Sequence, residues 1–221
     1  MTGQRQLSDA GDGRSCRKWA RPSLARPGGN VTGLSVEYSE DISGKWLELL
    51  QETIPRLASV AVIANPDTPL TGRLRKALEP AARARRMKLQ FIEVHEPAQA
   101  LDSSFRQAQR QTQAILVLPD PFTYQIRRQI AALAVKHRLP DMYVWLGYMD
   151  SGGLMAYGVD PANLYGRTAD YVDKILRGAK PADLPIEQPT KFKLIVNLKT
   201  AKALGLNIPE SILVRADEVI K

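Results

Sequence analysis

The chain has 221 residues, of which 44% are hydrophobic and 24% charged, and its formal net charge is +8. This composition is typical of a globular protein large enough to bury a core, and the longest apolar runs, ILVL and AALAV, are far shorter than the ~20 residues of a membrane-spanning helix. The single cysteine, Cys16, excludes an intrachain disulfide and a cysteine-based metal site.

The basic charge is concentrated near the start of the chain. Six basic and two acidic residues give 1–29 a net charge of +4, so the remainder is only mildly basic. Its one basic cluster, Arg83, Arg85 and Arg86, has no interleaved aromatic residues of the kind that single-strand binders use. We therefore interpret the cluster as a solvated helix face, and we predict no nucleic-acid partner.

Residues 1–22 show neither a helical nor a strand period and are rich in glycine, serine and charge, so we predict a disordered N-terminal segment. The first 20 residues also lack the apolar region of a secretory signal. The sequence as printed is therefore expected to stay in the cytoplasm.

From residue 23 onwards, apolar runs alternate with amphipathic segments. The expected strands are 31–36, 59–64, 89–94, 114–118, 142–146, 154–158 and 191–196. The expected helices are 40–54, 70–86, 98–112, 122–138, 161–177 and 198–204. Pro80 should kink or split its helix, and Asn197 and Gly205 should cap the last one. This alternation predicts an α/β fold: a doubly wound parallel sheet with helices on both faces.

Three expected strands end in polar turns that lead into helices, namely Asn65-Pro66-Asp67-Thr68, Pro119-Asp120-Pro121-Phe122-Thr123 and Val159-Asp160-Pro161. Ligands of open parallel sheets bind outside the carboxyl ends of the strands, so these turns form a candidate ligand-binding edge. Phe122 and Tyr157 would add aromatic surface there. Helix capping alone would also explain Asp67, Asp120 and Asp160. Trp145 and Tyr148 flank another strand end, where a place in the core is the more common role.

Enzymatic chemistry has little support in the sequence. His95 and His137 stand in unrelated contexts, and no metalloprotease, redox-dithiol or nucleophile-elbow motif occurs. Pro27-Gly28-Gly29-Asn30 lacks the lysine and hydroxyl residue of a phosphate-binding loop. We predict a protein that is not an enzyme and has no cofactor and no metal site.

From Ser23 to Lys221 the sequence resembles the substrate-binding proteins of ABC transporters, which have the type I periplasmic-binding fold. The segments that carry the resemblance are SLARPGGNVTGLS, GKWLELLQE, VAVIANPDT, AILVLPDPFT, HRLP, GGLMAYGVD, YVDKILRGAKPADLPIEQPTKFKLIVNLKTAKALGL and IPESILVRADEVI. The resemblance implies a solute receptor of an import system, whose two lobes close on a small amino-acid-like or related metabolite. Its partner would be a transporter permease, and its location would be the periplasm.

By position, the resemblance implies seven ligand-facing residues: Asn65, Asp67, Asp120, Phe122, Thr123, Tyr157 and Asp160. It makes 23–190 a ligand-binding α/β lobe and 191–221 a strand–helix segment that returns toward a first lobe. That first lobe and the export signal have no counterpart in the printed sequence, so we expect an N-terminally truncated form with half of a binding site. The alternatives are a non-functional gene fragment and a small α/β enzyme or nucleotide-binding domain.

Overall fold

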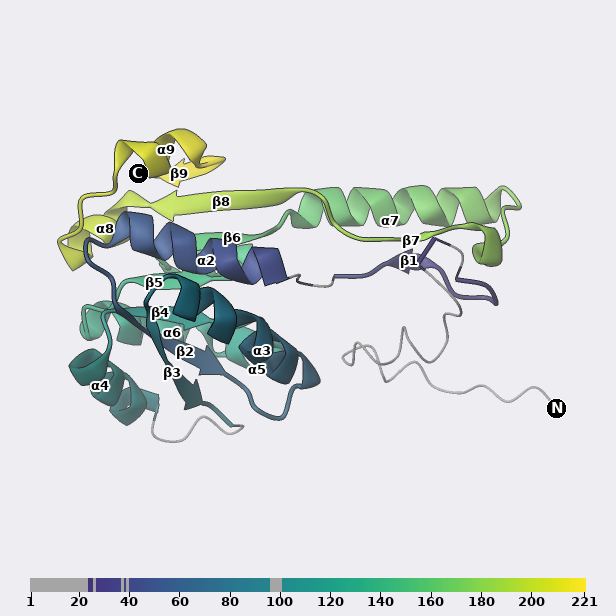
Figure 1. The fold of residues 1–221 in the computed structure, drawn as a ribbon. Helices are drawn as coiled ribbons and strands as arrows, with labels where there is room; N and C mark the ends of the chain where they lie inside the picture. Colours follow the sequence, from purple (N-terminus) through teal and green to yellow (C-terminus); the bar gives the residue numbers. More distant parts are fainter. Residues whose placement is uncertain (1–23, 26, 37, 39, 96–100) are drawn as a thin grey trace. The chain divides into compact units, whose positions relative to one another are not determined.

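The computed structural model describes residues 24–25, 27–36, 38, 40–95 and 101–221 (Figure 1). The segment 1–22, predicted to be disordered, lies outside these residues. The chain divides into two compact units. The smaller unit is Met1–Glu37, Thr68–Leu70 and Pro161–Thr190, and the larger unit is Tyr38–Asp67, Thr71–Asp160 and Lys191–Lys221. The predicted division into 23–190 and 191–221 was based on a C-terminal segment that returns toward a first lobe, and it stays a prediction.

The larger unit is built on a seven-stranded sheet. In sheet order its strands are β3 (Lys88–Glu93), β2 (Ser59–Ala64), β4 (Ala114–Val117), β5 (Asp141–Tyr143), β6 (Met155–Val159), β8 (Phe192–Asn197) and β9 (Glu218–Ile220). The first five are parallel to their neighbours, whereas β8 pairs antiparallel with β6, from Met155 opposite Val196 to Val159 opposite Phe192. The chain leaves β6 and re-enters β8 at the same end of the sheet, which makes this pair antiparallel. The α/β class is confirmed, with a mixed rather than a wholly parallel sheet.

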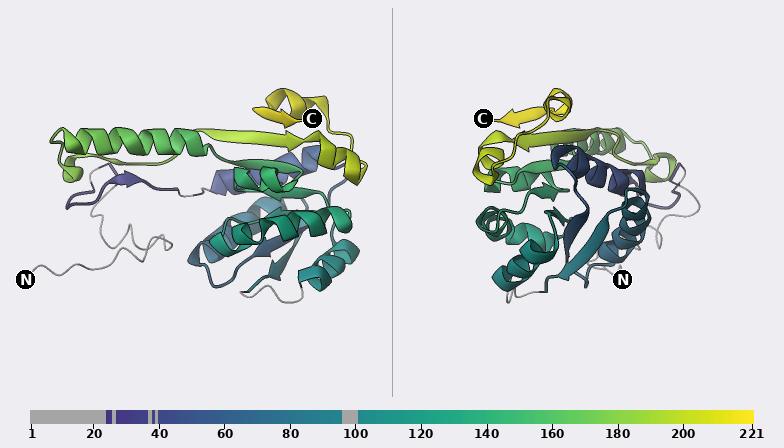
Figure 2. Two further views of the ribbon diagram at one scale, coloured as in Figure 1. Left: turned by 180° about the vertical axis from the view of Figure 1, so that it is seen from behind. Right: turned by 60° about the vertical axis from the view of Figure 1, so that its left-hand side comes forward.

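Helices cover both faces of this sheet, as predicted (Figure 2). The helices of the larger unit are α2 (Glu40–Thr53), most of α3 (Pro69–Ala84), α4 (Leu101–Gln111), α5 (Pro121–Gln125), α6 (Arg127–Lys136), α8 (Leu198–Leu204) and α9 (Glu210–Arg215). Phe105 of α4 and Ile130 of α6 share one buried cluster with Ile63, Ile115 and other residues of that sheet face. The opposite face is covered by α2, whose Trp46, Leu47 and Leu50 are fully buried, and by α3.

The expected strand 31–36 is observed only as the two-residue strand Gly33–Leu34, which is not part of the seven-stranded sheet. Three further expected elements also differ clearly from those observed. The helix α3 runs uninterrupted through Pro80, because its buried face, including Leu74 and Leu78, is held against the core while Pro80 itself faces solvent. The expected helix 122–138 is two helices that meet at Ile126. The Arg127 guanidinium donates at 3.0 Å to the carbonyl oxygen of Tyr124, an acceptor that a continuous helix would use for a backbone N–H.

The third difference is β5, which ends at Tyr143 instead of Leu146. Its register with β4 stops there, and a 3₁₀ helix, η1 (Leu146–Ser151), follows. The last predicted helix is confirmed, since the Asn197 side chain accepts from Thr200 N at 3.2 Å and Gly205 ends α8 with φ 72°.

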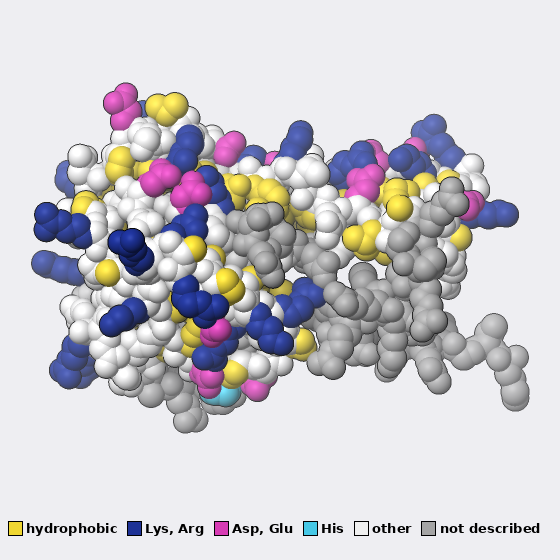
Figure 3. Space-filling model, viewed as in Figure 1, with side chains coloured by type: hydrophobic (Ala, Val, Ile, Leu, Met, Phe, Trp, Pro, Cys, Tyr) yellow, Lys and Arg dark blue, Asp and Glu magenta, His cyan; other side chains and the backbone are white. Residues whose placement is uncertain are grey.

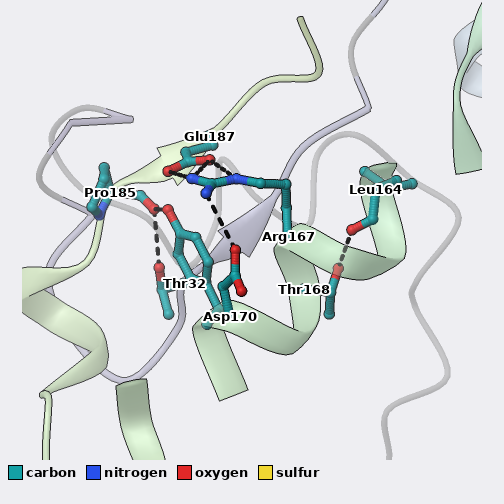
Figure 4. A network of polar contacts seen from close by, with 8 residues as sticks. Thr32, Leu164, Arg167, Thr168, Asp170, Pro185 and Glu187 are labelled. Atoms are coloured by element: carbon teal, nitrogen blue, oxygen red, sulfur yellow. Dashed lines mark hydrogen bonds and ion pairs between the residues drawn. The ribbon is translucent and has the colours of Figure 1, made fainter. Parts of the chain in front are cut away.

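The smaller unit contains β1 (Gly33–Leu34), α7 (Pro161–Leu176), a 3₁₀ helix η2 (Pro181–Asp183) and β7 (Ile186–Glu187), with β1 and β7 in parallel pairing. One face of α7 contacts the segment before and within β7 (Figure 4). Arg167 forms an ion pair with Glu187 at 2.6 Å, and the buried Tyr171 donates its hydroxyl to the carbonyl of Pro185 at 2.7 Å.

The opposite face of α7 is apolar and exposed. Tyr165, Val172 and Leu176 recur at helical spacing and are 73%, 51% and 82% exposed. In the region of α7, apolar side chains reach the surface among charged ones (Figure 3). None of the helices in the described part of the chain is long and apolar enough to cross a membrane.

Candidate functional site

The ends of β2 and β4 bring two of the predicted residues together. Asn65 follows β2 directly, and its Nδ2 lies 3.3 and 3.4 Å from the carboxylate oxygens of Asp120, which comes three residues after β4. Because β2 and β4 are adjacent and parallel, both residues lie at the carboxyl edge of the sheet. Asp120 is 2% exposed, whereas Asn65 is half-buried, so solvent can reach this pair only from the side of Asn65.

Asp120 also caps α5, as the helix-cap interpretation proposed. Its Oδ1 accepts from the backbone N–H groups of Phe122 at 2.8 Å and Thr123 at 3.2 Å. Capping leaves the other oxygen, Oδ2, facing Asn65. Thr123 is fully buried and Phe122 is partly buried against the core, so these two predicted residues support the edge more than they present a surface.

Asp67 occupies the exposed part of the β2 turn. Its backbone N–H donates to Asn65 Oδ1 at 3.0 Å, which shapes the turn, and its side chain lies 3.4 Å from His95 Nδ1. The Asp67 and His95 side chains are 74% and 59% exposed. A carboxylate this exposed contributes little to stability and remains accessible to a ligand.

Tyr157 lies in the middle of β6 and Asp160 directly follows this strand, which is two strands away from β4 in the sheet order. The Tyr157 ring stacks on Phe192 with ring centroids 5.8 Å apart, and its carbonyl accepts from Trp46 Nε1 at 2.9 Å. Asp160 forms an ion pair with Lys193 at 3.1 Å. Part of its charge is therefore compensated within the protein.

A group of aromatic residues lies near the end of β5, the strand between β4 and β6, and most of this group was not predicted from the sequence. Trp145, two residues after β5, meets the Tyr124 ring edge-on with centroids 5.4 Å apart. Tyr38 is hydrogen-bonded to Trp145 and packs edge-on against Trp46 at 5.6 Å. The sequence places Trp145 at a strand end, and Tyr124 follows Asp120 by one helical turn. Both positions could therefore have been used to predict aromatic residues at this edge. Nothing local marks Tyr38.

The tyrosines at this edge are neutral hydrogen-bonding groups. Burial raises the pKa of Tyr38 to about 12, and burial also raises the pKa of Tyr157. Their hydroxyls keep their protons near neutral pH and can donate hydrogen bonds there.

The arrangement is suited to binding rather than to catalysis. A carboxylate–amide pair can accept from an ammonium or hydroxyl group, and the partly buried Trp145 ring at the same sheet edge can contribute apolar surface. The Arg127 guanidinium lies over the Tyr124 ring, 4.4 Å from its centroid. Across the described ranges, no three His, Cys, Asp or Glu residues are grouped so that they could hold a metal ion.

Comparisons with known proteins agree with this interpretation. The family model described as "ABC transporter substrate binding protein" matches residues 21–220. A tyrosine-binding protein of Clostridioides difficile (strain R20291) is 26% identical over 188 residues, which are 83% of this chain and 52% of that protein. The chain thus spans about half the length of this curated relative.

Solved structures extend the comparison. A conserved domain protein from Vibrio cholerae has a TM-score of 0.81 and 27% identity, covering 91% of this chain and 67% of that one. An ABC domain in complex with L-Trp from Streptococcus pneumonia also has a TM-score of 0.81, at 23% identity, covering 95% and 69%. A periplasmic binding ribose operon repressor protein from Lactobacillus acidophilus, at 0.52 and 14%, covers 75% and 63% and shares the fold.

The fold is therefore of the type I periplasmic-binding kind, as predicted, and the family is one of binding proteins, in agreement with a non-enzymatic function. With a family model matched over nearly its whole length, the chain belongs to the ABC transporter substrate-binding protein family.

Proposed function

We propose that this chain provides one wall of the ligand site of a solute receptor in an ABC import system, and that its ligand is an aromatic amino acid. The observation that carries the proposal is the Asp120–Asn65 pair, which lies at the same sheet edge as Trp145 and Tyr124. The carboxylate would bind the ligand ammonium, and the rings would pack on its side chain. The names of two relatives, which bind tyrosine and L-Trp, support this ligand class.

The remaining parts of the proposal follow from the same family. A transporter permease would be the partner, and the receptor would act outside the cytoplasm. The second wall of the site would come from a further lobe, in keeping with a match to about half of the tyrosine-binding relative. The exposed apolar face of α7 supports such a lobe, because a surface of this kind is usually covered by another part of the protein.

Titration calorimetry and thermal shift with L-tyrosine, L-tryptophan and glycine test the ligand class. We expect saturable binding of the two aromatic amino acids and none of glycine, which has no side chain for the rings. A ligand at 100 times its dissociation constant should stabilise the protein by ~2.7 kcal/mol. One wall buries less ligand than a closed cleft, so concentrations in the millimolar range are appropriate.

The matched variants are Asp120→Asn and Asp173→Asn. Asparagine caps a helix as well as aspartate does, so D120N should fold normally and yet lose about tenfold or more in affinity, because the charge that pairs with the ammonium is gone. D173N removes an exposed carboxylate of α7 that pairs with Arg177, and affinity should not change. No binding of either aromatic amino acid, or equal binding by D120N and the unaltered chain, contradicts the proposal and favours a fragment without ligand affinity.

A further inference from the structure

Tyr148 is a fully buried tyrosine whose hydroxyl reaches the candidate binding edge. It lies in η1, between β5 and β6, and is 1% exposed. Its ring stacks on Tyr143, with centroids 4.2 Å apart and an interplanar angle of 18°, and meets Tyr124 edge-on at 5.6 Å. Packing therefore fixes the ring on two sides, and the position of its hydroxyl is determined.

That hydroxyl donates to Thr123 Oγ1 at 3.1 Å. The Thr123 hydroxyl in turn lies within reach of the carbonyl oxygens of Asp120, at 3.1 Å, and Leu118, at 3.4 Å. Burial raises the pKa of Tyr148, so the phenol keeps the proton that it donates. A continuous set of buried hydrogen bonds thus runs from Tyr148 to the backbone that carries Asp120.

The helix α5 has only five residues, from Pro121 to Gln125. A helix this short is not stable by its own hydrogen bonds, so its orientation depends on what its first turn contacts. Those contacts include the Asp120 cap and the Thr123 hydroxyl, beside the packing of Phe122 against the core. The Asp120 carboxylate must also remain 3.3–3.4 Å from Asn65 Nδ2, a distance that a small rotation of this turn would change.

We propose that Tyr148 is a positioning residue for the candidate binding edge: its phenol holds Thr123 and thereby fixes the first turn of α5 so that the Asp120 carboxylate faces Asn65. The effect on affinity rests on the proposed function. The effect on the position of Asp120 does not, and it can be measured without ligand.

The alternative is a core tyrosine whose hydroxyl is merely satisfied by a nearby acceptor. Tyr171 provides the matched control, since it is also buried, at 3% exposure, and donates one hydrogen bond to a backbone carbonyl, that of Pro185 in the smaller unit. Tyr148→Phe and Tyr171→Phe each remove one hydroxyl from a packed ring. A purely structural role predicts the same consequences for both.

The first experiment records amide NMR spectra of the ligand-free chain and its variants. In Tyr148→Phe we expect shifts at the N–H groups of Phe122 and Thr123, which donate to Asp120, and at the side-chain amide of Asn65. Tyr171→Phe should leave these signals in place. Unchanged signals at all three groups in Tyr148→Phe overturn the proposal, whatever the protein binds.

The second experiment measures affinity for L-tyrosine and L-tryptophan together with urea unfolding. Tyr148→Phe should weaken binding roughly five- to tenfold. Tyr171→Phe should lower the free energy of unfolding about as much as Tyr148→Phe does, but it should leave the affinity unchanged. Thr123→Val removes the acceptor of the Tyr148 hydroxyl and should weaken binding, whereas Thr123→Ser keeps this acceptor and should bind more tightly than Thr123→Val. In the double variant Tyr148→Phe, Thr123→Val, the two losses should not add, because both changes remove the same hydrogen bond.

The two experiments separate two kinds of failure. Shifts at Phe122 and Thr123 without any amino-acid binding uphold the positioning role and contradict the proposed function. Binding that is equal in Tyr148→Phe and the unaltered chain overturns the positioning role and leaves the proposed function standing. Fully additive losses in the double variant also overturn it, since they assign the effects of Tyr148 and Thr123 to separate causes.

Discussion

Gly158→Ala is expected to destabilise the larger unit by ~3 kcal/mol or more. Gly158 lies in β6, and a Cβ atom there would stand 1.8 Å from the carbonyl oxygen and 3.0 Å from the carbonyl carbon of Val144. The obstacle is backbone next to β5, so it cannot be relieved by a change of rotamer. Urea unfolding measures the loss, which should appear as a lower midpoint at an unchanged slope.

Gly44→Ala is the control within the same unit. Gly44 lies inside α2, and a Cβ there would make only ordinary contacts, at 3.9 Å to Ala81 and 4.0 Å to Arg85. Alanine should therefore stabilise this helix by about 0.5–1 kcal/mol. A small effect of Gly158→Ala, comparable in size with that of Gly44→Ala, would contradict the close approach of β6 to Val144.

Asp141→Asn is expected to remove a pH dependence of stability between about pH 4 and pH 7. Asp141 is fully buried at the start of β5, where it accepts from the Tyr143 hydroxyl at 2.7 Å and from Leu154 N at 2.6 Å. Burial raises its pKa from 3.8 to about 7. The folded state then holds a proton that the unfolded state releases, so stability falls as pH rises through this range and levels off above pH 7.

The size of the effect follows from the difference between the two pKa values. A shift of about three pH units corresponds to at most ~4 kcal/mol. Asparagine can accept from Leu154 N and donate to the Tyr143 oxygen, so D141N should match the unaltered chain near pH 4 and exceed its stability at pH 8. Urea unfolding at several pH values measures the difference in the free energy of unfolding between D141N and the unaltered chain. The other carboxylates titrate equally in both proteins, so their contributions cancel in this difference.

Asp170→Asn supplies the comparison for this experiment. Asp170 is an exposed carboxylate of α7 that pairs with Arg167, and its replacement should leave the pH dependence of the larger unit unchanged. A constant difference in stability between D141N and the unaltered chain from pH 4 to pH 8 would show that Asp141 does not titrate in this range.

Part of the candidate site could be predicted because its signals are local. Asn65 and Asp120 each follow a continuous apolar run, and parallel strands bring such positions to one edge. The cap formed by Asp120 could also be predicted, since an acidic residue before proline is a common helix start. The role of Tyr38 could not be predicted, because its partners, Trp46 and Trp145, belong to parts of the chain that come together only in the fold.

By itself, the sequence determined where most of the strands and helices of the large sheet lie and which polar residues follow the strands. These properties depend on hydrophobic periodicity and turn chemistry, which act over a few residues. The tertiary structure alone decided that β8 runs antiparallel to β6, that Asp160 pairs with Lys193, and that Tyr148 holds Thr123. Each of these depends on partners distant in the chain, whose hydrogen bonds and charges meet only when the sheet is assembled.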